Sequence, residues 1–384
     1  MRKAVVVAAS AAVMAAQFGI SASALSSGTT VPLGTYRFIA KVNSAVTGCS
    51  GALISPQWVV TAASCFPGNP TGGIPTSETT VAVGDVNVGT GTGRVARVST
   101  LVRRTDRDVM LAKLDIPVID VAPVRISSLA PTPGEVLRAA GFGRTAAEWV
   151  PDRPRTALFS VDAVTATTAA ITGVDGVDIC KGDAGGPAFR ETDGVVSLVA
   201  INSTSWQHGC LAVNETRQGS TEARLDDITD WITRTTDEPS RLVNDLSGWC
   251  LDQEYPQGTD GPATNTVGAW QCNSGDNQQW RWEWASPDTV RLVNALSGWC
   301  LDQEYPQGTD GPATNKVAAW QCNGGGNQQW RIEPTASGRR VLLVNKQSGW
   351  CLDQEYPQGT NGPATHIVAS WQCNGGRNQQ WQVS

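Results

Sequence analysis

Hydrophobic residues in the first part of the chain occur in short runs of Val, Ile, Leu and Thr that alternate with turns rich in Gly and Pro. Runs of this length and composition predict β-strands. The clearest of them are residues 79–83, 95–101, 136–140 and 195–201. A helical period first becomes clear in residues 225–234, where Ile228, Trp231 and Ile232 fall on one face. Many short strands followed by one terminal helix predict an all-β barrel or sandwich.

The pattern changes after residue 240, where one motif recurs three times. Each copy reads Ser-Gly-Trp-Cys-Leu-Asp-Gln-Glu-Tyr-Pro-Gln-Gly-Thr and is followed further on by Asn-Gln-Gln-Trp. The copies begin at Ser247, Ser297 and Ser348, so the period is near 50 residues. Three copies at this period predict a repeat architecture that forms a domain of its own.

A polar junction, Thr-Thr-Asp-Glu-Pro-Ser, separates the two patterns, and we interpret its end as a short linker. A chain of 384 residues is long enough for two domains with proper cores. We expect a first domain at 25–236, a linker at 237–240, and a second domain at 241–384 with repeats 241–290, 291–339 and 340–384.

The first 24 residues have the features of a secretory signal peptide. Arg2 and Lys3 precede an apolar run at residues 4–20, and Ala-Ser-Ala ends the segment at residue 24. We therefore expect cleavage before Leu25 and a secreted, extracellular protein. The 10 Cys residues are an even set, which suits an oxidising compartment and five disulfides.

Charge and hydropathy exclude some classes of partner. The formal net charge is -6 at pH 7, which argues against nucleic acid and anionic membranes. No apolar stretch after the signal peptide is long enough to cross a bilayer, so we expect no membrane insertion.

Several motifs in the first domain resemble those of trypsin/chymotrypsin-type serine proteases. Residues 180–187, Cys-Lys-Gly-Asp-Ala-Gly-Gly-Pro, resemble the family's nucleophile loop, but Ala184 stands where the family has Ser. Residues 49–65 resemble the region that carries the catalytic His, and Ser64 occupies the His position. Residues 108–114 resemble the segment of the catalytic Asp, so Asp108 is retained.

Further matches at residues 140–143 and 205–210 place the motifs in the family's order through nearly the whole domain. The resemblance implies a trypsin-like double β-barrel. It also implies disulfides between Cys49 and Cys65 and between Cys180 and Cys210.

The replaced residues predict a loss of catalysis. Acyl transfer in this family needs a hydroxyl nucleophile, an imidazole base and a carboxylate that holds the base. Ala184 has no hydroxyl and Ser64 has no imidazole, while Asp108 is a weak base at neutral pH. The chain has 2 His; we expect His208 to be too far from Ala184, and His366 lies in the other domain.

The resemblance assigns roles to other residues of the loop. Gly182 would form the turn on the oxyanion side, and Asp183 would pair with the mature amino terminus at Leu25. The alternative for Asp183 is a carboxylate satisfied by backbone donors. Asp178 stands where trypsin-like members bind Lys or Arg, but Gln207 stands where the cleft usually keeps a Gly, so the pocket is either open or partly blocked.

The threefold motif of the second domain resembles ricin-type lectin and carbohydrate-binding modules, which form a β-trefoil. The resemblance implies disulfides Cys250–Cys272, Cys300–Cys322 and Cys351–Cys373. It also implies one sugar site per repeat, built from an Asp, an exposed Trp and an Asn. These residues are Asp252, Trp270 and Asn277; Asp302, Trp320 and Asn327; and Asp353, Trp371 and Asn378. The closing Trp280, Trp330 and Trp381 are expected in the core.

Three functions remain open from the sequence. The leading hypothesis is a secreted carbohydrate-binding protein with an inactive trypsin-like domain. The second is an active serine endopeptidase that its lectin domain targets to glycans. The third is a non-catalytic protein whose cleft binds a peptide or a protease inhibitor. The expected partner is a polysaccharide or glycan surface, and we expect no cofactor and no metal.

Overall fold

The computed structural model describes residues 25–26, 28–45, 47–254, 265–286, 289–304, 315–335, 340–355 and 366–384. The expected signal peptide, residues 1–24, lies outside these residues. So does most of the long loop that follows the Cys-Leu-Asp-Gln strand of each repeat.

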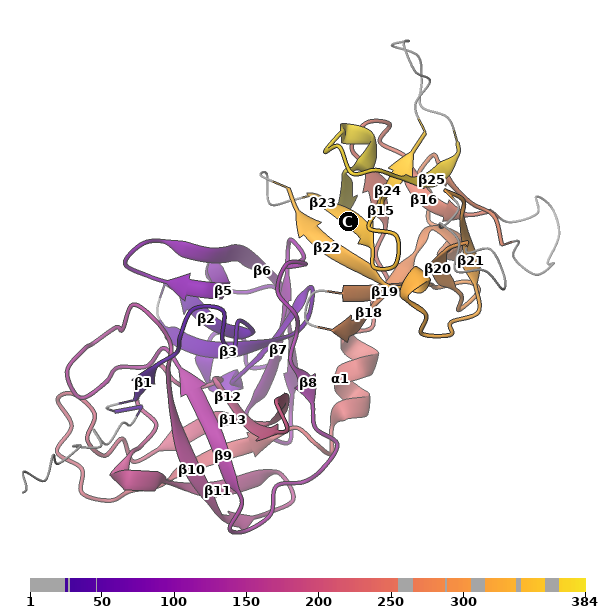
Figure 1. Ribbon diagram of the computed structural model, residues 1–384. Helices are drawn as coiled ribbons and strands as arrows, with labels where there is room; N and C mark the ends of the chain where they lie inside the picture. Colours follow the sequence, from indigo (N-terminus) through magenta and orange to yellow (C-terminus); the bar gives the residue numbers. More distant parts are fainter. Residues whose placement is uncertain are drawn as a thin grey trace, which may run out of the picture.

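The first domain begins with a closed barrel of antiparallel strands (Figure 1). Buried and partly buried positions alternate along β5, where one face meets the core, and Val81 and Val83 are fully buried. Their order around the barrel is β2 (Ile39–Ser44), β3 (Gly48–Ser55), β4 (Trp58–Thr61), β7 (Val109–Leu114), β6 (Thr92–Arg104) and β5 (Thr79–Asn87). A short 3-10 helix, η1 (Ala63–Cys65), follows β4.

A second barrel follows, and its core is a separate cluster around Leu137, Phe159 and Ile171. Its ring of paired strands is β9 (Val136–Gly141), β10 (Arg155–Val164), β11 (Thr168–Gly173), β14 (Ser220–Arg224), β13 (Val195–Ser205) and β12 (Pro187–Thr192). Strands β1 (Thr29–Thr30) and β8 (Arg125–Ile126) pair with β10 and β13, and η2 (Val174–Gly176) follows β11. The expected trypsin-like double barrel is therefore confirmed.

The four strands expected from hydrophobic runs are confirmed as parts of β5, β6, β9 and β13. The helix α1 (Thr229–Thr236) begins four residues later than its apolar period indicates. The reason lies in tertiary contacts, because the Leu225 N–H donates to the Val199 carbonyl of β13 and Asp227 binds Arg107.

The second domain is a β-trefoil in which each repeat supplies four strands and a short 3-10 helix. The first repeat has β15 (Leu242–Asn244), β16 (Cys250–Gln253), β17 (Val267–Trp270), η3 (Asp276–Gln278) and β18 (Trp280–Ser286). The second has β19 (Thr289–Asn294), β20 (Cys300–Gln303), β21 (Val317–Trp320), η4 (Gly326–Gln328) and β22 (Trp330–Pro334). The third has β23 (Arg340–Asn345), β24 (Cys351–Gln354), β25 (Val368–Trp371), η5 (Arg377–Gln379) and β26 (Trp381–Val383).

The closing Trp of each repeat forms the trefoil core, as the sequence predicted. Trp280, Trp330 and Trp381 are fully buried. Each indole N–H donates to the carbonyl of the Leu after the first Cys of its repeat, at 3.0, 3.0 and 3.1 Å. A buried indole N–H that finds an acceptor avoids the cost of an unpaired donor.

The five disulfides join the pairs that the family resemblances imply. They link Cys49 to Cys65, Cys180 to Cys210, Cys250 to Cys272, Cys300 to Cys322 and Cys351 to Cys373. Each bridge closes a loop inside one domain.

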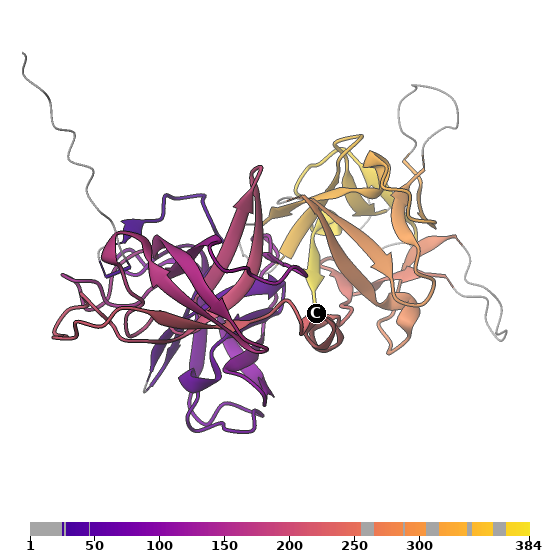
Figure 2. The same cartoon turned by 90° about the horizontal axis from the view of Figure 1, so that it is seen from below.

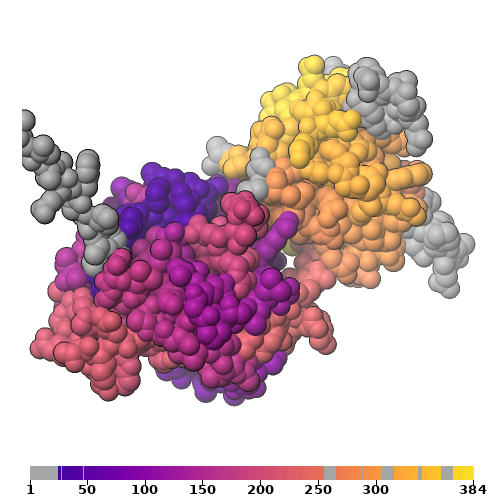
Figure 3. Space-filling view, turned by 60° about the horizontal axis from the view of Figure 1, so that its bottom comes forward, coloured from indigo at the N-terminus to yellow at the C-terminus, as the bar shows by residue number. Residues whose placement is uncertain are grey.

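The domains lie beside one another as two lobes (Figures 2 and 3), and α1 lies near their junction (Figure 1). Ile119 of the first domain packs into the hydrophobic cluster of the trefoil. Lys113 forms an ion pair with Glu238, and Arg125 donates to the Trp284 carbonyl at 3.0 Å. Figure 1 shows β16, β20 and β24 on the side of the trefoil away from the first domain. None of the helices in the described ranges is both long and apolar enough to cross a bilayer.

Candidate functional site

The cleft between the two barrels begins with Asp108, which immediately precedes β7. Its Oδ1 accepts the Ser64 backbone N–H at 2.7 Å, and its Oδ2 accepts the Ser64 hydroxyl at 3.0 Å. The Ser203 hydroxyl donates to the same Oδ2 at 2.8 Å. Ser64 thus occupies the place from which an imidazole would contact Asp108, and three donors satisfy the carboxylate.

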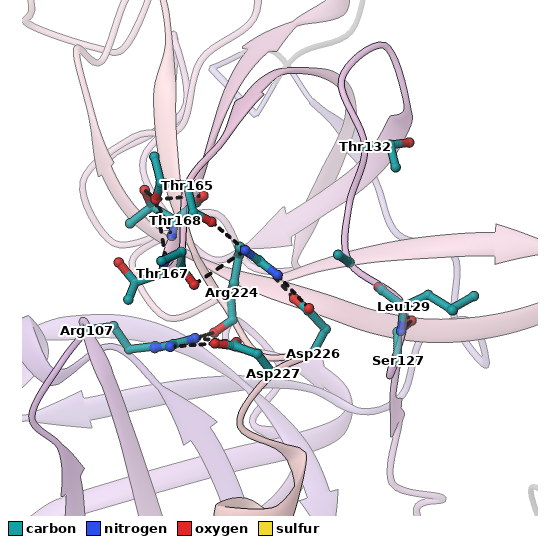
Figure 4. Close-up of polar contacts among 12 residues, drawn as sticks. Arg107, Ser127, Leu129, Thr132, Thr165, Thr167, Thr168, Arg224, Asp226 and Asp227 are labelled. Atoms are coloured by element: carbon teal, nitrogen blue, oxygen red, sulfur yellow. Dashed lines mark hydrogen bonds and ion pairs between the residues drawn. The ribbon is translucent and has the colours of Figure 1, made fainter.

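Arg107 holds this segment against the second barrel (Figure 4). Its guanidinium donates to both carboxylate oxygens of Asp227 at 2.6 and 2.8 Å and to the Arg224 carbonyl at 2.9 Å. The Arg107 side chain is only 3% exposed, whereas the Asp227 side chain is 37% exposed, so this bidentate pair joins a buried guanidinium to a carboxylate at the surface. Arg224 extends the network to Asp226 and to the Thr165 carbonyl. The network anchors Arg107, the residue immediately before Asp108.

The loop before β12 has the backbone shape that its glycines permit. Gly182 has φ 104° and Gly185 has φ 82°, both in the region that favours Gly. A Cβ at Gly185 would lie 2.2 Å from Thr61 Oγ1, so a side chain there has no room. Ala184 lies between these two glycines, and its carbonyl accepts the Ser50 N–H at 2.9 Å.

A cleft of about 420 Å³ opens beside Ala184. Its lining includes Ser64, Ser203, Lys181 and Gln207. The Gln207 backbone has φ 64°, and its side-chain oxygen accepts a bond from Arg144 at 2.7 Å. The cleft therefore persists without the hydroxyl and the imidazole that acyl transfer requires.

Asp178, the expected specificity residue, is fully buried. Its Oδ1 accepts the Ile179 N–H at 2.9 Å and the Ser220 hydroxyl at 2.5 Å. Its Oδ2 accepts the His208 N–H at 3.1 Å. These bonds satisfy the carboxylate from within the fold, and no exposed surface of Asp178 is left to meet a basic side chain.

Asp183 lies in the second barrel and is 1% exposed. Its Oδ1 accepts the Gly143 N–H at 2.7 Å and its Oδ2 accepts the Cys180 N–H at 2.9 Å. Burial raises the pKa of Asp183 to about 7 against the opposing effect of these two bonds. Glu222 is also fully buried, and burial, followed by the charge of Asp183, raises its pKa well above the usual range. Sequence reasoning missed Glu222.

In the trefoil, each predicted Asp is oriented by two side-chain amides of its own repeat. In the first repeat, Asn277 donates to Asp252 Oδ1 at 3.0 Å and Gln278 donates to Asp252 Oδ2 at 2.7 Å. Asn277 also donates to the Gln253 carbonyl at 3.3 Å. The same contacts recur on Asp302 and Asp353. The Asn therefore orients the Asp, and the buried Gln is a site residue that the sequence motif contains but whose role was missed.

An exposed indole lies close to each of these carboxylates. Asp252 pairs with Gly268 across β16 and β17, and Trp270 follows two residues later on the same face. Trp270, Trp320 and Trp371 are 47%, 50% and 53% exposed. A carboxylate beside an exposed flat ring can accept hydroxyl protons while the ring packs against an apolar face.

Burial raises the pKa of Asp252, Asp302 and Asp353 above the usual range, although the Gln and Asn donors oppose this effect. A nearby Glu in each repeat adds a smaller upward contribution. No group of three or more His, Cys, Asp or Glu side chains in the described part of the chain is arranged to hold a metal.

Comparison with known proteins gives two family matches. Residues 25–232 match the trypsin family model, and residues 238–381 match that of the ricin-type beta-trefoil lectin domain. "Inactive snake venom serine proteinase 13" of Crotalus adamanteus is 32% identical over 178 residues, which are 40% of this chain and 66% of that relative. "Snake venom serine proteinase 14" of the same snake is 29% identical over 230 residues, 51% of this chain and 81% of the relative.

This chain thus spans slightly less than two thirds of the first relative. Among solved structures, a designed 3-fold symmetric protein, ThreeFoil, has 35% identity and a TM-score of 0.30, covering 38% of this chain and 96% of its own.

Proposed function

Because the chain belongs to the trypsin family and continues into a ricin-type β-trefoil lectin domain, we propose that it is a secreted carbohydrate-binding protein whose trypsin-like domain cleaves no peptide. The proposal includes the boundaries 25–236, 237–240 and 241–384, with residues 1–24 as a signal peptide. The ligand would be a polysaccharide or a dense glycan surface.

One observation carries the sugar-binding part of this proposal. The same oriented Asp stands beside an exposed Trp in all three repeats. The packing indoles of the trefoil, Trp280, Trp330 and Trp381, are buried, whereas this second Trp of each repeat stays at the surface. A glycan array probed with the purified protein tests the proposal, and the absence of any bound glycan would contradict it.

The Asp carboxyls predict that sugar binding weakens in mild acid. The ionised form accepts hydroxyl protons at both oxygens, whereas protonation turns one oxygen into a donor. Because burial raises these pKa values, binding should decline with a midpoint above the ordinary Asp value of about 3.9. Polysaccharide pull-down between pH 7 and 4 measures this. Binding that stays constant down to pH 4 would refute the prediction.

For the first domain, we propose that Leu25 is the mature amino terminus and that its ammonium pairs with Asp183. Leu25 is 1% exposed and packs in the second barrel's core cluster, which also contains Ile179. A buried ammonium would neutralise a buried carboxylate that otherwise has only backbone donors as described partners.

This pairing predicts a difference in the pH dependence of stability. An Asp with its pKa raised from 3.8 to about 7 contributes stability at low pH that is lost as the pH rises through about 7. The chain that starts at Leu25 should lose less stability between pH 4 and 7 than a chain extended by one residue. Thermal unfolding of the two proteins measures this, and Asp183→Asn should remove the difference. A different first residue by mass spectrometry would remove the basis for the pairing.

The cleft favours a second candidate function, the binding of a peptide or a protease inhibitor without cleavage. Its volume of about 420 Å³ is retained next to Ala184. The burial of Asp178 indicates that such a ligand would not be anchored by Lys or Arg. Binding of an inhibitor without labelling by a fluorophosphonate would support this candidate.

A further inference from the structure

The three trefoil repeats differ at one position that lies beside the exposed indoles. Two residues before β17, β21 and β25 stand Asn265, Asn315 and His366. Each of these residues contacts the next Trp-bearing strand rather than its own, and its carbonyl accepts a backbone N–H there at 2.7 to 2.8 Å. His366 in this way reaches β17 of the first repeat, across the ends of the domain.

The imidazole of His366 stacks on two indoles of the first repeat. Its ring lies 4.1 Å from the Trp270 ring with an angle of 26° between the planes. It lies 5.0 Å from the Trp249 ring with an angle of 17°. In the second repeat, where Asn265 takes this place, the equivalent rings of Trp299 and Trp320 are 6.5 Å apart and tilted by 47°.

The stack leaves Trp270 nearly as exposed as its counterparts. Trp270 is 47% exposed, close to the 50% of Trp320 and the 53% of Trp371. The polar half of the first site is also unchanged, since Asp252 has the same Asn and Gln donors as its counterparts. The difference is confined to what holds the indole in place.

We infer that His366 is a positioning residue that makes the first site, formed by Asp252, Trp270 and Asn277, the tightest of the three. An exposed Trp supported by a stacked ring has lost side-chain freedom before the ligand arrives, so less is lost on binding. The inference rests on the proposed sugar binding, and it assigns unequal roles to three repeats whose motifs are nearly identical.

Proteins with one remaining site test the inference. Trp320→Ala with Trp371→Ala leaves the first site, and the other two double variants leave the second and the third. Calorimetry with galactose and xylose oligomers should give a Kd about 3- to 10-fold lower for the first site than for the others. His366→Asn should abolish this advantage, whereas His366→Phe, which keeps a flat ring, should retain it.

The same His366→Asn change in the second-site protein is the matched control and should leave its Kd unchanged. Equal affinities of the three single-site proteins would overturn the inference, and so would an unchanged first site in His366→Asn. If the parent protein binds neither these oligomers nor any glycan on an array, the proposed function is contradicted, and not the inference about His366 alone.

A measurement without ligand tests whether His366 holds the Trp270 indole in place, even if the parent protein binds no sugar. The heteronuclear NOE of the indole N–H reports how rigidly each Trp is held. It should be higher for Trp270 than for Trp320 and Trp371, and His366→Asn should lower it to their level. The Asn265→His variant, which places an imidazole beside Trp320, should raise the heteronuclear NOE of the Trp320 indole N–H. Three equal values in the parent protein would overturn the inference.

Discussion

The purified protein is expected to hydrolyse no peptide or ester substrate above background. Ala184 offers no nucleophile, and the side-chain group that Asp108 binds at position 64 is a hydroxyl instead of an imidazole. Loss of a complete triad costs about 10⁶ in turnover in a comparable serine protease. Assays with peptide and ester substrates, together with a fluorophosphonate probe, measure this. Turnover that survives exhaustive purification and disappears in Ser64→Ala would contradict it.

Restoring the triad should separate the contributions of its members. Ala184→Ser alone supplies a hydroxyl without a base, so it should remain nearly inactive. With Ser64→His added, Asp108 lies where it can accept the imidazole N–H, because it already binds both donors of residue 64. General base catalysis should then raise turnover about 10²–10⁴-fold over Ala184→Ser. Equal activity of the single and double variants would show that the Asp108 geometry does not support catalysis.

Polymer binding should be lost when all three exposed indoles are removed. One shallow site, with a ring face and a few hydroxyl contacts, should bind on the order of 1 mM, near -4 kcal/mol. A polysaccharide that spans two or three sites gains roughly 10²–10⁴ through effective concentration. Trp270→Ala, Trp320→Ala and Trp371→Ala should each weaken binding in part, and the triple variant should not bind. Polysaccharide pull-down and calorimetry measure the series.

Two controls distinguish a lost site from a lost fold. Trp149→Ala removes an indole of the first domain that is 63% exposed and should leave polymer binding unchanged. Trp280→Ala removes a fully buried indole and should destabilise the trefoil by about 3–5 kcal/mol. A folded triple variant that binds polymer as well as the parent would refute the three-site model.

Features carried by neighbouring residues were accessible from the sequence. Local motifs reveal the replacements at Ala184 and Ser64. The three nearly identical copies of one motif predict the trefoil. The disulfides join residues 16 to 30 positions apart within one motif. The core role of Trp280 and its counterparts was also predictable, because each occupies the same place in every repeat.

Side-chain directions that depend on strand register required the tertiary structure. Two serines of β13, Ser203 and Ser205, line the cleft, and only the structure shows their different partners. Ser203 donates to Asp108, whereas Ser205 donates to the Ile179 carbonyl. Likewise, the burial of Asp178 depends on Ser220, 42 residues away on another strand.

The sequence by itself determined the two folds, the missing catalytic groups and the three candidate sugar sites, because each depends on residues that are close together or strictly repeated. Only the tertiary structure decided how these sites differ. His366 lies 97 residues from Ala269, whose carbonyl it approaches, and it reaches Trp270 because the trefoil closes its third repeat onto its first. A contact between the first and the third repeat cannot be predicted from the spacing of neighbouring residues, because it forms only when the whole trefoil has closed.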